Sequence, residues 1–88
     1  MLKVWGKIIK NGKLIKSETF TSGKAALEEA MLEALEYFGK VFDIEVPMWQ
    51  SNHTVELVAF RRIIFREDDF IDKINFDRFE IEVLERDN

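Results

Sequence analysis

The sequence contains no cysteine, a single proline, four glycines and a single histidine among its 88 residues. Without cysteine, neither a disulfide framework nor a thiolate metal site can form, and a lone histidine, His53, excludes a histidine-rich zinc site. The glycines are dispersed, so no glycine-rich loop is available to cradle a phosphate. No apolar run approaches the ~20 residues of a membrane span, and the N-terminus lacks the apolar core of a signal peptide. We therefore expect a cytoplasmic protein with no cofactor, no metal and no membrane partner.

Aromatic residues and charges are, in contrast, plentiful. Eight Phe, two Trp and one Tyr indicate a globular chain, and the length indicates one domain spanning residues 1–88. The net charge of −4 is unevenly distributed, because residues 1–24 hold six lysines and one acid, whereas residues 25–88 hold seven basic and sixteen acidic residues. This asymmetry favours an electrostatic partner or the self-association of unlike faces.

The most regular pattern in the chain predicts a helix over residues 22–39. Apolar side chains recur at helical spacing and form one stripe: Leu27, Ala30, Met31, Ala34, Leu35 and Phe38. Thr21 or Ser22 is suited to cap the first turn, and Gly39 is suited to the left-handed conformation that ends a helix. A lone helix of this length is marginal in water, so we expect the stripe to pack on a sheet.

The N-terminal segment predicts a β-hairpin formed by residues 2–10 and 13–20. Asn11-Gly12 lies between them, and both residues tolerate the positive φ of a two-residue turn. Such a turn predicts four pairs: Lys10 with Lys13, Ile8 with Ile15, Gly6 with Ser17, and Val4 with Thr19. We expect the face bearing these apolar and small residues to lie against the helix, with Gly6 and Ser17 leaving room for close approach.

The opposite face of this hairpin is then exposed to solvent. It carries lysines among large apolar side chains: Trp5, Lys7, Ile9, Leu14, Lys16 and Phe20. Lysines neutralise phosphates and exposed aromatic rings stack on unpaired bases, so this face is a candidate nucleic-acid surface. Lysines on an edge hairpin also simply block aggregation, and the acidic remainder of the chain favours that explanation.

Residues 40–54 predict an irregular segment folded back on the domain. Pro47 disfavours helix at Val46 and favours extended chain. We expect Trp49 to anchor this segment, mostly buried against Phe38 or the end of the third strand, with its N–H bonded to a carbonyl group. The alternative is an exposed Trp49 that forms a binding surface with His53.

Two further strands are predicted in the C-terminal half, over residues 55–66 and 78–85. The first is rich in β-branched and aromatic residues, and a bulge at Arg61-Arg62 would let both of its apolar halves face the core. The alternative is a central strand that is covered on both sides. One of these arginines is expected to pair with Glu80 or Glu82, and a ligand or partner role is the alternative. In the last strand, Phe79, Ile81 and Val83 are expected to point inward, and Arg78, Glu80 and Glu82 outward. Between the strands, Asp68 or Asp69 is expected to cap one helical turn over Phe70 and Ile71.

The element order is therefore β-β-α-β-β, which predicts an α+β fold of two layers. Its simplest arrangement is a four-stranded antiparallel sheet with one helix packed on one face. The strand order is left open by the sequence, as is the question of whether Arg61 or Arg62 faces the core.

No catalytic constellation stands out. His53 with Asp43, or His53 with Glu45, is the only candidate acid–base pair, and a lone histidine in a polar segment is more often a surface residue. The serines have no nucleophile-elbow motif around them, and the acids of residues 67–72 lack the spacing of a calcium loop. We therefore expect a protein that is not an enzyme.

Several short motifs resemble those of an uncharacterised family of short proteins from Gram-positive anaerobic bacteria. They are Val46-Pro47-Met48-Trp49, then Asn52 and Thr54, Phe60-Arg61-Arg62, and Phe76-Asp77-Arg78-Phe79-Glu80-Ile81. The resemblance covers nearly the whole chain. It implies a free-standing cytoplasmic protein and supplies no catalytic residue, and neither His53 nor the lysine hairpin matches it.

The functional expectation is a small interaction module that binds a partner protein or a second copy of itself. The alternative is nucleic-acid binding through the lysine-rich hairpin, and a third possibility is a small enzyme with a pocket around His53 and Trp49. The candidate interaction residues are Trp5, Lys7, Lys16, Phe20, Trp49, His53, Arg61 and Arg62.

Overall fold

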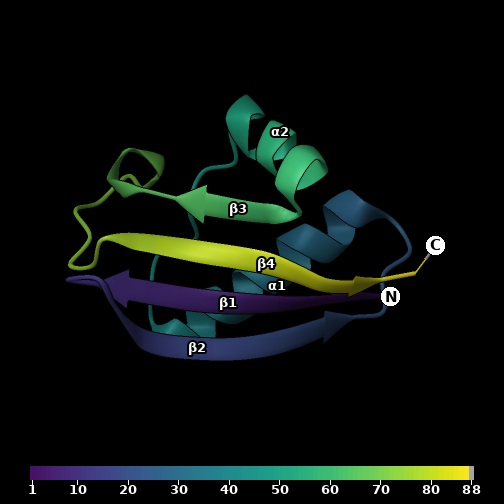
Figure 1. Cartoon of the computed structure of the whole chain (residues 1–88), viewed down its shortest axis with the longest axis horizontal. Helices are drawn as coiled ribbons and strands as arrows, with labels where there is room; N and C mark the ends of the chain where they lie inside the picture. Colours follow the sequence, from purple (N-terminus) through teal and green to yellow (C-terminus); the bar gives the residue numbers. More distant parts are fainter. Residues whose placement is uncertain (88) are drawn as a thin grey trace.

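Residues 1–87, the part of the chain that the computed structural model describes, form a four-stranded antiparallel sheet with two helices (Figure 1). The elements in chain order are β1 (Leu2–Lys10), β2 (Lys13–Ser22), α1 (Leu27–Phe42), α2 (Ser51–Phe60), β3 (Arg62–Phe65), the 3₁₀ turn η1 (Glu67–Asp69) and β4 (Arg78–Arg86). The strand order is β2-β1-β4-β3, which places β1 and β4 at the centre. The expected α+β class and antiparallel sheet are confirmed, but the order β-β-α-β-β is wrong because it lacks α2.

The N-terminal hairpin forms as expected at its turn but not along its length. Asn11 and Gly12 both have positive φ, and Lys10 lies opposite Lys13. A bulge between Ile8 and Ile9 then shifts the pairing by one residue, so that Ile8 lies opposite Lys16. The predicted pairs beyond the turn are therefore wrong. A slip of one residue exchanges the two faces of a strand, and every side chain of β2 after the bulge changes side.

The shift exposes one apolar residue of β2 and brings another into contact with the core. Ile15, expected in the core, is 49% exposed. Phe20, expected in solvent, packs against the core and stacks on Tyr37 of α1 with ring centroids 4.6 Å apart. On β1, where the expected face is confirmed, Leu2, Val4 and Ile8 are buried.

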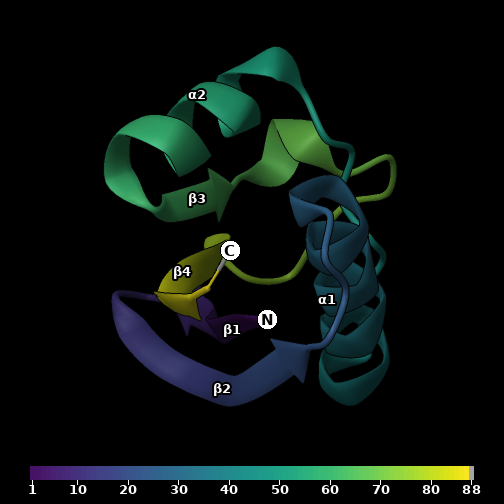
Figure 2. The ribbon, with the colours of Figure 1, turned by 90° about the vertical axis from the view of Figure 1, so that its right-hand side faces the viewer.

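Helix α1 lies against one face of the sheet (Figure 2), and its closest approach is at Gly6. A Cβ atom on Gly6 would lie 2.7 Å from a carbon of the Phe38 ring, so only glycine leaves space for this ring. The ring is fully buried and contacts Phe42 and Phe79. The expected role of Gly6 is confirmed, whereas Ser17 is exposed on β2, opposite Lys7.

The ends of α1 differ from those expected, although its apolar stripe is buried. Ser22 is the last residue of β2, where it pairs with Leu2, because the strand ladder continues to the end of β1. The helix therefore starts at Leu27, without a side-chain cap. It continues past Gly39 to Phe42 and ends at Asp43, which adopts the left-handed conformation expected of Gly39.

Residues 51–60 form a helix, α2, where the sequence predicted the end of a loop and most of a strand. Only two of its apolar or aromatic side chains, His53 and Leu57, are buried, and they lie one turn apart. The β-rich composition suggested a strand, but tertiary contacts at these two positions override that propensity. Arg61 ends α2 with φ 54°, so the predicted bulge at Arg61-Arg62 is a helix terminus. The third strand is therefore short and comprises Arg62–Phe65.

The last strand and the turn before it are close to expectation. Phe79 and Ile81 are buried and Val83 is partly buried, whereas Glu80, expected to point into water, is buried and paired with Arg78 at 2.7 Å. The 3₁₀ turn precedes Phe70 instead of covering it. No helix within residues 1–87 is long and apolar enough to cross a bilayer.

The two edges of the sheet differ. At the β3 edge, the backbone N–H of Ile64 donates to the carboxylate of Glu56 on α2 at 3.0 Å. Figure 2 shows α2 beside β3, beyond the end of the sheet. At the other edge, β2 is ten residues long and nearly all of its side chains are exposed. The sheet is therefore covered at one edge and open at the other.

Gly6→Ala should destabilise the protein by about 1–3 kcal/mol, because the added methyl group overlaps a ring that has no free space to move into. The measurement is urea unfolding followed by circular dichroism. Gly23→Ala is the control, because nothing lies within 4 Å of a Cβ atom there, and its stability should stay within about 0.5 kcal/mol of the parent. Equal effects of the two variants would show that the close approach of α1 is unimportant.

Candidate functional site

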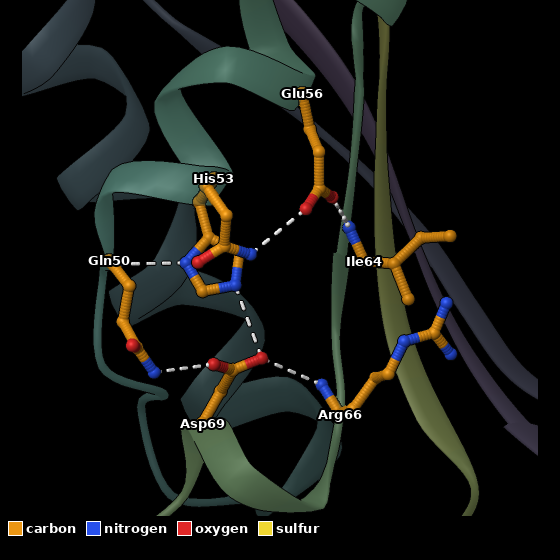
Figure 3. Close-up of polar contacts among 7 residues, drawn as sticks. Gln50, His53, Glu56, Ile64, Arg66 and Asp69 are labelled. Atoms are coloured by element: carbon orange, nitrogen blue, oxygen red, sulfur yellow. Dashed lines mark hydrogen bonds and ion pairs between the residues drawn. The ribbon is translucent and has the colours of Figure 1, made fainter.

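A buried carboxylate, that of Asp69, holds the first turn of α2 (Figure 3). Its Oδ1 accepts a hydrogen bond from Gln50 Nε2 at 2.7 Å, and its Oδ2 accepts one from the backbone N–H of Arg66 at 2.9 Å. The Nε2 atom of His53 lies 3.1 Å from the same Oδ2. The Asp69 carboxylate therefore connects α2 to the turn η1.

The hydrogen bonds of His53 define its tautomer. Its Nδ1 accepts from the backbone N–H of Gln50 at 2.9 Å, so in the neutral ring the proton lies on Nε2 and is donated to Asp69. The side chain is 0% exposed. Both ring nitrogens are thus engaged and shielded from water, which makes His53 a structural link between two elements.

The expectations for His53 are therefore corrected. It was expected in a polar surface segment, with Asp43 or Glu45 as its nearest acid, and it lies buried on α2 beside Asp69. Glu45 instead accepts a hydrogen bond from the backbone N–H of Asp72 at 3.2 Å. A binding surface shared by Trp49 and His53 does not form, because the imidazole does not reach solvent.

Next to this cluster, an apolar groove of about 330 Å³ separates α1 from α2. Its lining comes from both helices and the segment between them: Leu27, Glu28, Met31, Leu32, Leu35, Trp49, Thr54, Leu57 and Val58. Leu32 is 55% exposed and Val58 is 77% exposed, so apolar side chains form its rim as well as its floor. The groove extends toward the C-terminal end of α2, where Leu27, Leu57 and Val58 also border a second hollow with Arg61, Val83 and Arg86.

Trp49 lies on the wall of this groove and is 39% exposed. Its indole N–H donates to the hydroxyl of Thr54 at 2.9 Å, and its ring contacts Phe65, the last residue of β3. The expected contact with the end of the third strand is confirmed. The expected deep burial and carbonyl partner are wrong, because the segment is held instead by Asp69, whose backbone oxygen accepts from the N–H of Met48 at 2.7 Å.

Charges flank the groove unevenly. Along α1, Glu28 lines the groove, and beyond Leu32 a further hollow is bordered by Lys24, Glu29, Glu33 and Glu36. At the C-terminal end of α2, the flanking charges are positive and come from Arg61 and Arg86. The groove lining itself therefore carries one charged side chain, that of Glu28, and the two arginines belong to the adjoining hollow.

The lysine face predicted on the hairpin does not form. Lys7 pairs with Glu82 at 3.2 Å and lies over the Trp5 ring at 4.2 Å. Lys16 has moved to the helix side through the bulge, where its Nζ donates to the carbonyl oxygen of Phe42 at 2.9 Å. Lys7 and Lys16 thus lie on opposite faces, and Phe20 lies beside α1 instead of with Trp5.

The two arginines are both exposed, but the predicted ion pairs are made by other residues. Glu80 pairs with Arg78, and Glu82 pairs with Lys7. Arg61 instead borders the groove extension described above, and Arg62 lies opposite Glu82 on β4. Of the eight residues predicted as an interaction surface, Trp49 lines the groove and Arg61 borders the hollow next to it.

Searches among protein-family models, curated proteins and solved structures found no match to this chain. The likeness to a family of short bacterial proteins stays a prediction. Over residues 1–87, the fold itself defines the class of protein: a small α+β domain with a four-stranded antiparallel sheet, two helices and an apolar groove between the helices.

Asp69→Asn should destabilise the protein by about 1–3 kcal/mol. The amide presents a donor where the carboxylate accepts from three donors, so at least one buried bond is lost. Asp68→Asn, an exposed position in the same turn, is the matched control and should change stability by less than about 0.5 kcal/mol.

Urea unfolding measures both variants, and the fluorescence of Trp49 in a Trp5→Phe background reports on the groove wall. Equal stability of the two variants would mean that the Asp69 hydrogen bonds contribute nothing to the fold.

Proposed function

We propose that this protein is a non-enzymatic interaction module that binds a protein partner in the groove between α1 and α2. The observation that carries the proposal is the exposure of Val58 at 77% and Leu32 at 55% on the rim of an apolar groove of about 330 Å³. Single exposed apolar residues are normal, whereas contiguous ones around a concavity are typical of a binding surface.

The size and the apolar lining of the groove suit contact with the surface of another protein. Covering an exposed side chain of the size of Leu or Val contributes about 1.5–3 kcal/mol if burial is complete. Trp49 adds a large ring that is already oriented by Thr54 and Phe65, and Trp is enriched among residues that dominate binding energy. A micromolar dissociation constant corresponds to about 8 kcal/mol, and contacts of this kind must also offset the freedom that two molecules lose on association.

Two other functions have less support. General acid–base catalysis needs a titratable group within reach of a substrate, and both nitrogens of the buried His53 are already bonded. Nucleic-acid binding by the hairpin needs Lys7 and Lys16 on one face, and these lysines lie on opposite faces with partners of their own. The interaction surface proposed here is consequently the helical groove instead of the hairpin.

The test compares two variants that place a carboxylate on an exposed apolar position. Val58→Glu introduces a charge at the groove, and Ile15→Glu introduces the same charge on β2, at a position that is 49% exposed and outside the groove lining. The parent and both variants also carry Leu32→Cys, which supplies the only thiol because the natural chain has no cysteine. A photo-crosslinking group is attached to this thiol.

Crosslinked products are then counted for the purified protein alone and for the protein in a cell extract. We expect Val58→Glu to lower the yield of specific protein adducts at least tenfold and Ile15→Glu to leave it unchanged. Equal adduct yields from the two variants, or no protein adduct with the parent in either setting, would refute an interaction role for the groove.

A further inference from the structure

We infer that the outer edge of β2 pairs with β2 of a second copy of this chain, which gives a two-fold symmetric dimer. This surface is separate from the groove, because none of the residues that line the groove belongs to β2. Figure 1 shows β2 along the lower margin of the molecule, as the outermost strand of the sheet. A two-fold interface uses the same surface on both copies, so the edge must be complementary to itself.

The neighbouring strand β1 shows which residues of β2 direct their backbone groups outward. The carbonyl oxygen of Ile9 accepts from the N–H of Asp77, just before β4, so Ile9 directs its backbone groups toward β4. Successive residues of an antiparallel strand direct these groups to opposite sides, so Ile8 directs its groups toward Lys16 of β2, which lies opposite. Lys16 in turn faces β1. Counted along the strand from Lys16, the residues whose N–H and C=O groups point outward are Ser17, Thr19 and Thr21.

This outward-facing stretch lacks the usual protection of an edge strand. Such edges are commonly kept short, or carry proline, lysine or a bulge. The bulge of β2 and its two lysines, Lys13 and Lys16, all lie toward the turn. Residues 17–22 contain neither proline nor lysine, and they pair with β1 in one continuous register. They therefore form a regular edge that can accept a further strand.

The charges of β2 are complementary to themselves about Ser17. Lys16 and Glu18 lie on either side of it, and both point to the face of the sheet that bears α1. The Nζ atom of Lys16 donates to the carbonyl oxygen of Phe42, and a carboxylate oxygen of Glu18 lies 3.5 Å from the hydroxyl of Tyr37. In an antiparallel pair centred on Ser17, Lys16 of each copy lies opposite Glu18 of the other, and the contact occurs twice. The ammonium has three donors, so it can keep its bond to Phe42 and also reach the carboxylate.

The other registers that bring outward backbone groups together match the charges less well. A pair centred on Glu18 places two like charges opposite each other, which is destabilising. A pair centred on Thr19 places Glu18 opposite Phe20 and Lys16 opposite Ser22. The charges therefore favour an axis at Ser17, and this self-complementarity favours a second copy over a foreign strand.

Helix α1 lies on the face of the sheet, inward of this edge. The ring of Phe38 packs on Gly6 of β1, one strand inward from β2. An antiparallel pair with like faces together has its two-fold axis normal to the sheet. The helices of the two copies therefore stay on one face, on either side of the axis.

The first experiment traps the dimer with a disulfide, since the natural chain has no cysteine. An axis at Ser17 brings the two copies of this residue to a Cα separation of about 5.5 Å, which suits a disulfide. The two copies of Thr19 then lie more than about 12 Å apart, because each is two residues from the axis. We expect Ser17→Cys to give at least ten times more disulfide-linked dimer under mild oxidation than Thr19→Cys. Both positions are exposed, so random collision would give equal yields.

The second experiment is a charge exchange, followed by sedimentation equilibrium of the purified protein up to about 0.5 mM. We expect a monomer–dimer equilibrium for the parent. Lys16→Glu should weaken the dimer roughly tenfold or more, because the substitution acts at two contacts. Lys16→Glu combined with Glu18→Lys should restore most of the affinity. Lys10→Glu, on β1, controls for the change in net charge and should have little effect, and circular dichroism of each variant confirms that the fold is retained.

The outcomes separate this inference from the proposed function of the groove. Val58→Glu should leave the dimer unchanged, and a dimer that is lost with Val58→Glu but insensitive to Lys16→Glu overturns pairing through β2. A parent that stays monomeric at about 0.5 mM, or equal disulfide yields at Ser17 and Thr19, overturns the dimer and leaves the groove proposal standing. An affinity that the charge exchange does not restore overturns the register.

Discussion

The position of α2 depends on one buried carboxylate. The helix buries two side chains, His53 and Leu57, which is little apolar surface for an element of ten residues. Asp69 compensates by accepting hydrogen bonds from the residue before the helix, from the helix itself and from the chain after β3. Inside a protein such bonds act at low dielectric, and leaving one donor unsatisfied costs more than the bond contributes. Polar contacts therefore hold α2, which forms one wall of the groove. The other wall, α1, is held by the apolar contact between Phe38 and Gly6.

Sequence patterns predicted the parts of the fold that follow from local periodicity. The stripe of α1, the Asn11-Gly12 turn and the alternation of β4 each repeat a simple spacing, and each forms an element close to the expected one. The register of β2 did not follow from the sequence. A single bulged residue near Ile15 reverses the faces of the strand, and nothing in the composition or the length of the segment reveals it. Because of that one residue, Lys16 and Phe20 lie on the opposite face of the hairpin from Trp5 and Lys7, so the predicted surface does not form.

The groove was missed for a related reason. Helix α2 has apolar residues on the side that faces water as well as on the side that faces the core, so its sequence shows no helical stripe and was predicted to be a strand. An apolar outer face weakens the helical signal and, at the same time, marks a surface suited to a partner. The failure of the pattern at residues 55–60 therefore coincides with the candidate site. Among the predicted site residues, Trp49 lines the groove and Arg61 borders the adjoining hollow, because they flank α2.

The unequal edges of the sheet have a consequence for polymerisation. A sheet that is open on both sides can recruit strands at either end, and each addition exposes a new edge, so growth has no natural stop. Here Glu56 occupies the outward N–H of Ile64, and α2 lies beside the short β3, which leaves β2 as the one long open edge. If two molecules join through β2, each presents its covered edge outward and the assembly terminates as a pair. A single carboxylate on α2 thus removes a free N–H group from the β3 edge, where a further strand would otherwise pair.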